Sequence, residues 1–252
     1  RCIETIKCQS ILPFELIIVD SGGVNQREII SSLLKGSGIR LVYIFEKLAR
    51  VLALNRALQI STADYLFRFD TRSRFGSDYA KSALNLLNNK QLNLKYVGGV
   101  PNVLPESTSR ESIICAGIMK RSYIFFYPRH RQINYNGNCS SIYLGCFSSK
   151  ELQEIKYSED VNLVSEDSLI SANFRDRGYV PFISNTIKLA YVSRSSLKRI
   201  LMLFHTYGYC RFNSIVSSKK IHSFSRYLFL FFLSILSLVC LILNFNLSMI
   251  VL

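Results

Sequence analysis

Short apolar runs alternate with stretches of helical spacing along the first hundred residues. Four runs have the length and apolar content of buried strands: residues 15–20, 40–45, 64–70 and 96–100. Helical spacing occurs before and between them, at residues 2–6, 26–35, 49–60 and 77–89. Strands that alternate with helices at this spacing predict a layered α/β domain with a mostly parallel sheet.

The pattern becomes less regular beyond Pro105. Residues 110–120 and 149–155 have helical spacing. Between them, residues 122–141 are aromatic, basic and irregular, which is typical of a loop region that faces a substrate. The second half of the domain therefore looks less like a repeated strand–helix unit than the first half does.

A further helix is predicted over residues 166–178, and it begins with the adjacent acidic residues Glu166 and Asp167. An extended run follows at residues 179–192. Residues 196–213 then show an amphipathic pattern, and such a helix either lies in a membrane interface or packs on the globular domain. Both placements remain open from the pattern alone.

The chain has no charged residue from Tyr227 to Leu252. Because roughly 20 apolar residues span a bilayer, a transmembrane segment is predicted over residues 227–252, with a buried core helix as the alternative. The basic flank of Lys219, Lys220 and Arg226 predicts that the preceding residues face the cytoplasm at the inner membrane. We therefore expect a catalytic domain over 1–192, an amphipathic helix and basic linker over 193–226, and the membrane segment.

A formal net charge of +14 changes the choice of partner. Anionic lipid and phosphorylated substrates both suit such a surface. Nucleic acid is the competing partner, but the Lys and Arg residues are spread along the chain without a nucleic-acid-binding motif, so no nucleic acid is expected. Seven cysteines without a C-x-x-C and only three histidines favour reduced packing thiols over a zinc site.

Three carboxylates stand at positions where chemistry is common. Asp20 and Asp70 each close an apolar run, and open α/β sheets bind ligands at the carboxyl ends of their strands. Asp167 stands at a helix start, where it either opposes the helix dipole or serves as a general base. Neither the dinucleotide-binding G-x-G-x-x-G nor the P-loop motif is present.

The order of short strings along the chain resembles a known family. These strings are I-I-V-D-S-G, A-L-N-R-A-L, D-Y-L-F-R-F-D-T-R-S-R-F, V-G-G-V, Y-L-G-C-F, S-E-D and Y-V-S-R-S-S-L. Together they resemble the inverting family 2 glycosyltransferases, most of all the membrane-associated branch that builds succinoglycan and other bacterial surface polysaccharides. The resemblance, which covers about Cys2 to Arg211, implies a GT-A fold and sugar transfer from a nucleotide-diphospho-sugar donor to a lipid-linked saccharide acceptor.

The resemblance also implies roles for individual residues. Asp20 falls where family members contact the base or ribose of the donor, and Asn55 falls where they brace the nucleotide site. Asp70 matches the first Asp of their D-x-D motif, which holds a divalent metal, Mg²⁺ or Mn²⁺, on the donor diphosphate. Asp167 matches the base that deprotonates the acceptor hydroxyl, and Glu166 beside it orients or caps.

The sequence departs from the family pattern at several positions. Arg72 replaces the second acidic residue of D-x-D, so either Asp70 alone holds the metal or Arg72 supplies part of the metal's charge to the phosphate. Leu169, Asn173 and Leu203 also differ from the residues usual in relatives. The family's first strand would lie upstream of this sequence. A non-catalytic GT-A-like subunit that binds saccharide or supports assembly is therefore the alternative function.

Overall fold

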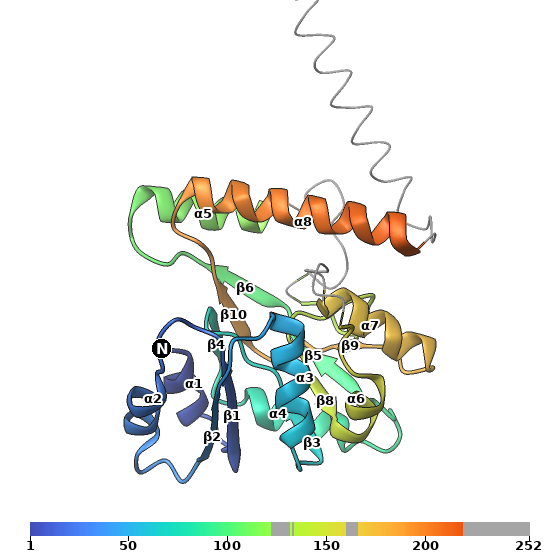
Figure 1. Cartoon of the computed structure of the whole chain (residues 1–252). Helices are drawn as coiled ribbons and strands as arrows, with labels where there is room; N and C mark the ends of the chain where they lie inside the picture. Colours follow the sequence, from blue (N-terminus) through green and yellow to red (C-terminus); the bar gives the residue numbers. More distant parts are fainter. Residues whose placement is uncertain (122–131, 133, 160–165, 219–252) are drawn as a thin grey trace, which may run out of the picture. The chain divides into compact units, whose positions relative to one another are not determined.

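The computed structural model describes residues 1–121, 132, 134–159 and 166–218 (Figure 1). The chain divides into two units, Arg1–Thr206 and Tyr207–Leu252. The first unit carries every strand of the described residues, and the described part of the second is the end of one long helix. The predicted transmembrane segment over 227–252 lies outside the described residues, and no helix within them is long and apolar enough to span a membrane.

The first strand–helix–strand unit forms as predicted. Its elements are α1 (Cys2–Lys7), β1 (Glu15–Asp20), α2 (Arg27–Leu34) and β2 (Arg40–Phe45). Strands β1 and β2 run parallel, from Glu15 opposite Arg40 to Asp20 opposite Phe45. Among the described strands β1 pairs on one edge only, and the further strand expected upstream stays a prediction.

The next segment differs from the prediction at three places. Its elements are α3 (Arg50–Ile60), β3 (Tyr65–Phe67), β4 (Ser73–Phe75), α4 (Tyr79–Leu87), β5 (Tyr96–Gly98) and β6 (Pro101–Leu104). Two of these places are the unpredicted strands β4 and β6. The strand predicted over 64–70 ends at Phe67, because the chain turns where the Ser73 amide donates to the Asp70 carbonyl at 2.9 Å. Strand β6 was not predicted, since proline is disfavoured within strands but is accepted as their first residue.

The second half adds short strands and four helices among the described residues. In chain order they are α5 (Arg110–Arg121), β7 (Gly137–Asn138), β8 (Cys146–Ser148), α6 (Ser149–Ile155), α7 (Glu166–Asp176), β9 (Phe182–Ile183), β10 (Leu189–Val192) and α8 (Leu197–Ser218). The predicted helices at 149–155 and 166–178 are confirmed. Most of the predicted loop region over 122–141 lies outside the described residues.

The sheets are mixed, so the prediction of a mostly parallel sheet is wrong. A five-stranded sheet has the order β3-β8-β5-β9-β7, and a three-stranded sheet has the order β4-β10-β6. Strand β8 lies between β3 and β5 and runs antiparallel to both, whereas β5 and β9 are parallel, as are β6 and β10. Apolar runs identify strands without fixing their direction, which here depends on how the loops after Pro105 return the chain.

An aromatic core fixes α7 against the five-stranded sheet. The ring of Tyr96 on β5 stacks on Phe147 of β8, with ring centroids 4.3 Å apart. Phe174 of α7 completes the group at 5.1 Å from Tyr96, and all three side chains are fully buried. Large buried rings contribute much of the apolar area of a core. They therefore hold the first turn of α7, with its two acidic residues, at a defined place on the sheet.

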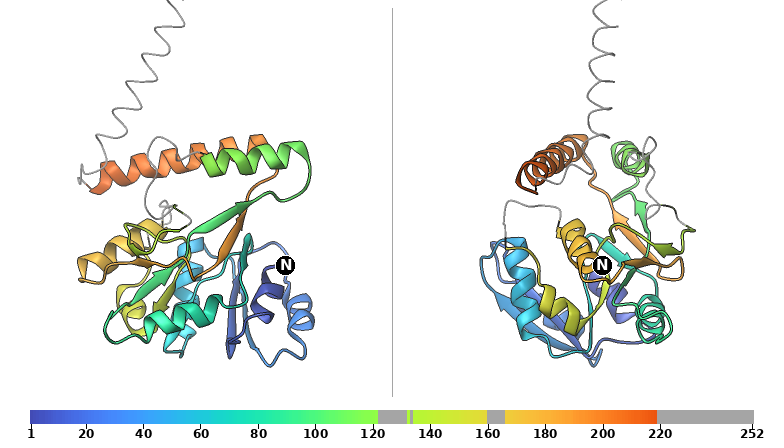
Figure 2. Two further views of the ribbon diagram at one scale, coloured as in Figure 1. Left: turned by 180° about the vertical axis from the view of Figure 1, so that it is seen from behind. Right: turned by 90° about the vertical axis from the view of Figure 1, so that its right-hand side faces the viewer.

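Helix α5 and the first turns of α8 pack against one another beside β6 and β10 (Figure 2). Ile200 of α8 is buried against Cys115, Ala116 and Met119 of α5. The amphipathic helix predicted over 196–213 is thus present, and one face of its first turns is covered by protein.

Candidate active site

An arginine that follows strand β3 lies at the centre of the site. The Arg68 side chain is buried, and its two terminal nitrogens donate separately to Asp167 Oδ1 and Glu166 Oε1, each at 2.6 Å. Burial opposes the charge on Arg68, but the neighbouring Asp167 and Glu166 raise its pKa, so the guanidinium stays charged. A charged residue inside an apolar run is the signal that sequence reasoning missed, because buried arginines require partners.

The two acidic residues of α7 differ in accessibility. The Glu166 side chain is 6% exposed, and its Oε1 accepts from Arg68 and from Arg50 Nε at 2.9 Å. The Asp167 side chain is 25% exposed. Both stand in the first turn of the helix, where the backbone dipole favours negative charge. Glu166 is therefore a buried anchor, whereas Asp167 remains within reach of a ligand.

Arg50, the first residue of α3, joins Asp70 to this pair. Its Nη2 lies 3.2 Å from Asp70 Oδ2, while its Nε contacts Glu166. More than half of the Arg50 side chain is exposed. The structure thus brings Asp70, Glu166 and Asp167 together through Arg50 and Arg68, two arginines that the sequence reasoning did not single out.

A left-handed turn supplies a further contact to Asp167. Leu144, at φ 64°, donates its backbone N–H to the Asp167 carboxylate, and Gly145, at φ 102°, accepts from the Arg68 backbone N–H at 3.0 Å. Burial raises the pKa of Asp167 above its usual value, while Arg68 lowers it and Glu166 raises it again. The string Y-L-G-C-F therefore contains the turn that holds both members of this ion pair.

Asn55 supports the site from a second layer. Its amide exchanges two hydrogen bonds with the Tyr157 backbone, each of 2.9 Å, and both groups are buried. The Tyr157 ring lies under the Arg68 guanidinium, 5.6 Å from its centroid, and burial raises the Tyr157 pKa to about 12. Asn55 consequently braces Arg68 through a neutral tyrosine.

The turn after Asp70 directs Arg72 away from the carboxylates. Asp70 Oδ1 accepts from the Arg72 backbone N–H at 3.0 Å. The Arg72 guanidinium instead reaches the carbonyls of Val192 and Ser193, at 3.5 and 3.3 Å, and lies 3.7 Å from a Glu106 carboxylate oxygen. The second position of the motif is therefore a cation that contacts two carbonyl oxygens and lies near one carboxylate.

Tyr143 is a further residue that sequence reasoning missed. Its hydroxyl forms a 2.9 Å hydrogen bond with the Ser73 hydroxyl. Burial raises the Tyr143 pKa, and the charges of Asp70 and Asp167 raise it further. The Tyr143 hydroxyl is therefore neutral and can donate a hydrogen bond.

Asp20 lies at the carboxyl end of β1, as predicted. It accepts from the Gly22 amide at 2.8 Å and from the Tyr43 hydroxyl of β2, and the Tyr43 hydrogen bond lowers its pKa. Within the described part of the chain, no hydrogen bond or ion pair joins Asp20 to Asp70 or to the acidic pair of α7. Asp20 lies at the end of the two-stranded sheet β1-β2, and its predicted contact with the nucleotide stays a prediction.

Solved structures share this fold, although no family model matches the chain and no curated protein matches its sequence. The mannosyltransferase PcManGT from Pyrobaculum calidifontis, in complex with GDP-Man and Mn²⁺, matches 76% of the chain at 15% identity and a TM-score of 0.56. S. aureus TarS 1-349 in complex with UDP-GlcNAc matches the same share at 11% identity and a TM-score of 0.51. The fold is a glycosyltransferase fold.

This glycosyltransferase fold covers only part of those proteins. The chain spans 52% of the PcManGT chain and 54% of the TarS chain, about half of each. At identities of 11–15% the likeness shows the fold and leaves the roles of single residues as predictions.

The residues around Asp70 do not by themselves make a metal site of the expected kind. Mg²⁺ and Mn²⁺ take several oxygen ligands, usually including carboxylates. Asp70 is instead contacted by Arg50 and by the Arg72 amide, and Glu166 is held by two arginines. Residues 1–121, 132, 134–159 and 166–218 contain no group of three or more His, Cys, Asp or Glu side chains placed to hold a metal ion. A divalent metal on Asp70 therefore stays a prediction.

Proposed function

We propose that this chain is an inverting glycosyltransferase of family 2 that moves a hexose from a nucleotide-sugar donor to a lipid-linked saccharide in bacterial surface polysaccharide synthesis. The observation that carries the proposal is Asp167. It is a partly exposed carboxylate at a helix start, fixed by Arg68 and lying near Asp70, in a glycosyltransferase fold.

Asp167 is suited to the role of general base. Its carboxylate would take the proton of the acceptor hydroxyl while that oxygen attacks the anomeric carbon of the donor. The bond from the anomeric carbon to the diphosphate oxygen breaks, its electron pair leaves with the diphosphate, and the configuration inverts. Arg68 fixes the direction of the carboxylate, which is the kind of positioning that supports such a reaction.

The other predicted residues have supporting roles in this proposal. Glu166 and Arg50 hold the base and Asp70 in one cluster, and Asn55 supports Arg68 through Tyr157. Asp20 would contact the base or ribose of the nucleotide from the end of β1. No step requires Asp20 or Asn55 to exchange a proton.

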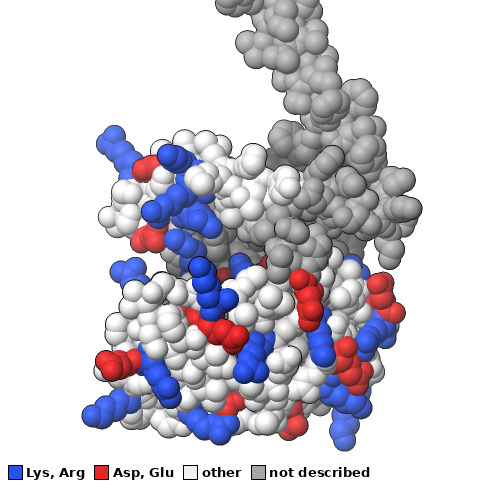
Figure 3. Space-filling view, in the orientation of Figure 1, with Lys and Arg blue, Asp and Glu red and all other residues white. Residues whose placement is uncertain are grey.

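The exposed surface of α5 and α8 supports a membrane location. Ile113 and Ile114 on α5 and Leu201 and Met202 on α8 are each more than half exposed. Lys and Arg side chains gather over the end where these helices begin (Figure 3). Apolar side chains beside basic ones suit an anionic bilayer surface.

We therefore place the enzyme at the cytoplasmic face of the inner membrane, where a lipid-linked acceptor is accessible. The full chain should stay in the membrane pellet after a carbonate wash at high pH. Recovery of the full chain in the supernatant would contradict the location.

The test of the activity is donor turnover by the full chain in membranes. Asp167→Asn should lower the transfer rate by about 10²–10⁴-fold, the usual contribution of general base catalysis, while nucleotide binding is kept. Asp176→Asn is the matched control, because Asp176 is an exposed acidic residue at the other end of α7. Transfer by Asp167→Asn at the wild-type rate would reject Asp167 as the base.

The alternative, a non-catalytic subunit of the same fold, gives a different result in the same experiment. It predicts that wild-type membranes bind UDP or GDP but transfer no sugar from any donor tested. Turnover that depends on Asp167 and not on Asp176 would reject the alternative.

A further inference from the structure

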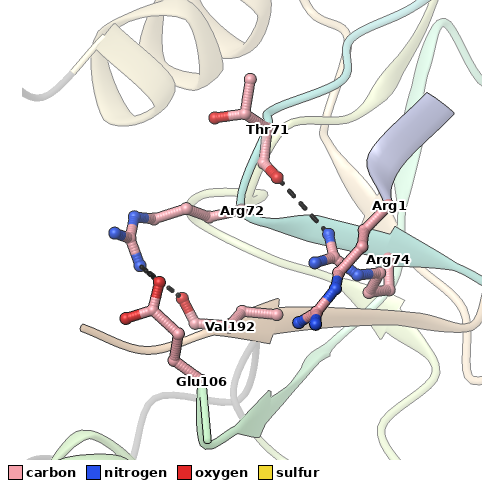
Figure 4. A pocket seen from close by; sticks show the side chains of 6 residues that line it. All are labelled: Arg1, Thr71, Arg72, Arg74, Glu106 and Val192. Atoms are coloured by element: carbon pink, nitrogen blue, oxygen red, sulfur yellow. Dashed lines mark hydrogen bonds and ion pairs between the residues drawn. The ribbon is translucent and has the colours of Figure 1, made fainter. Parts of the chain in front are cut away.

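A cationic pocket opens beside the turn that follows Asp70. It has a volume of about 300 Å³ and is lined by Arg1, Thr71, Arg72, Arg74, Glu106 and Val192 (Figure 4). At ~30 Å³ for each water molecule, this volume holds roughly ten waters, which is room for a diphosphate group. Thr71 joins the pocket directly to Asp70 of the site described above.

The arginines of the pocket retain donors for a ligand. Among the described residues, the hydrogen bonds of the Arg72 and Arg74 guanidinium groups use the Nη1 nitrogen only, and they go to backbone carbonyls. A guanidinium has five N–H donors, so most of them are available. Glu106 lies 3.7 Å from Arg72, and both side chains are about one-third exposed. An incoming anion can therefore replace Glu106 at little cost.

The same turn lacks what a divalent cation would need. The residue two positions after Asp70 is a cation, and the Asp70 oxygens already accept from Arg50 and from the Arg72 amide. Two guanidinium groups and one carboxylate at this turn favour an anion. Guanidinium groups also bind phosphate oxygens in a paired geometry that a point charge does not offer.

We propose that Arg72 and Arg74 bind the diphosphate of the sugar nucleotide directly and take the place of a divalent metal. This inference rests on the proposed function, and it deepens it by naming how the donor is held. The two guanidinium groups would also stabilise the negative charge that develops on the departing diphosphate. Binding and transfer should then proceed without added metal.

The experiment is a titration of the purified full chain in detergent with UDP and with GDP, in EDTA and in Mn²⁺. We expect affinities that agree within about twofold between the two conditions, and at least a tenfold loss in Arg72→Ala, the order of a charge-assisted hydrogen bond. Arg74→Ala is the second variant in case the first fails to fold. Arg177→Ala is the matched control, since Arg177 directly follows α7, far along the chain from the pocket residues, and pairs with the exposed Glu154 of α6.

A reversal variant sharpens the test. Arg72→Asp restores an acidic residue two positions after Asp70, so its nucleotide affinity should be weak in EDTA and recover in Mn²⁺. Inorganic pyrophosphate and a short isoprenyl diphosphate form a second arm. Both should compete with UDP or GDP for the wild-type pocket.

The possible failures are distinct. Two results would overturn the inference without affecting the proposed glycosyltransferase activity. One is nucleotide binding by the wild type that is lost in EDTA and restored by Mn²⁺. The other is nucleotide binding by both Arg72→Ala and Arg74→Ala with wild-type affinity. Binding of the isoprenyl diphosphate without competition from nucleotides would assign the pocket to the lipid acceptor and also overturn it. No nucleotide binding in either condition would reject the proposed function itself.

Discussion

Arg68 and Arg72 lie four positions apart, yet their surroundings are opposite. The Arg68 side chain is 6% exposed and binds two carboxylates at 2.6 Å. The Arg72 side chain is 30% exposed and contacts two carbonyls and, at 3.7 Å, one carboxylate. The buried arginine is committed to the protein, because its charge and those of its partners compensate one another. Arg72, the more exposed arginine, keeps N–H donors that can bind a ligand.

The largest expected effect is on stability, from removal of the buried arginine. Arg68→Met leaves Glu166 and Asp167 without their main cation, which should lower the free energy of unfolding by about 3–5 kcal/mol. Denaturant unfolding of the purified full chain measures this change in the free energy of unfolding. Arg68→Lys keeps the charge but lacks the fork that reaches both carboxylates, so it should fall between wild type and Arg68→Met. Equal stability of all three proteins would contradict a committed ion cluster.

The turn that holds the cluster should be the next most sensitive. Gly145 has φ 102°, and a Cβ there would lie 2.3 Å from the Tyr96 ring. Gly145→Ala should therefore cost about 1–3 kcal/mol of unfolding free energy. Gly117→Ala is the control, because Gly117 lies in α5 with open space around it, and the change there should be stabilising by up to about 1 kcal/mol. A Gly145→Ala protein as stable as wild type would contradict the expectation that this turn cannot accept a Cβ.

The open arginine should have little effect on the same measurement. Arg72→Ala removes a partly exposed ion pair, so the free energy of unfolding should change by less than about 1 kcal/mol. Its effect belongs to nucleotide binding, as described above. If Arg72→Ala destabilised the protein as much as Arg68→Met, the distinction between a structural and a ligand-binding arginine would be lost.

The smallest effect concerns Asp20 and its tyrosine partner. The Tyr43 hydroxyl lowers the Asp20 pKa below its usual 3.8, so this carboxylate contributes stability that is present above pH 3.8 and lost as pH falls through the lower folded pKa. Tyr43→Phe removes the hydrogen bond and should raise the Asp20 pKa toward its usual value. The midpoint of acid unfolding should then move slightly to higher pH. A midpoint that moves lower would contradict the stabilising role of Tyr43.

The sequence predicted the elements better than their arrangement. Strand β1, its parallel neighbour β2 and helix α7 were predictable because each carries a strong apolar period and a clear start or stop. Strand directions in the second half were not, since an antiparallel β8 and a parallel β9 have equally short apolar runs. Direction depends on tertiary pairing, which local pattern does not encode.

For the site, the sequence analysis singled out the carboxylates but not the two arginines that bind them. Asp70, Glu166 and Asp167 lie in one cluster with Arg50 and Arg68. Asn55 hydrogen-bonds the Tyr157 backbone beside Arg68, and Asp20 lies at the end of β1 with Tyr43 as its partner. Arg50 was missed because an arginine in a basic chain gives no signal of its own. The signal of Arg68, a charge inside an apolar run, was overlooked. In the structure, burial among carboxylates distinguishes Arg68 from the arginines on the surface.

The most direct test of Asp167 as the catalytic base is the pH dependence of sugar transfer by full-length protein in membranes. A base works in its ionised form, and burial raises the Asp167 pKa above 3.8, so the wild-type rate should fall on the acid side through an apparent pKa higher than that value. Asp167→Asn should be slow and should lack this acid limb. An unchanged acid limb in Asp167→Asn, at any rate of transfer, would contradict the assignment.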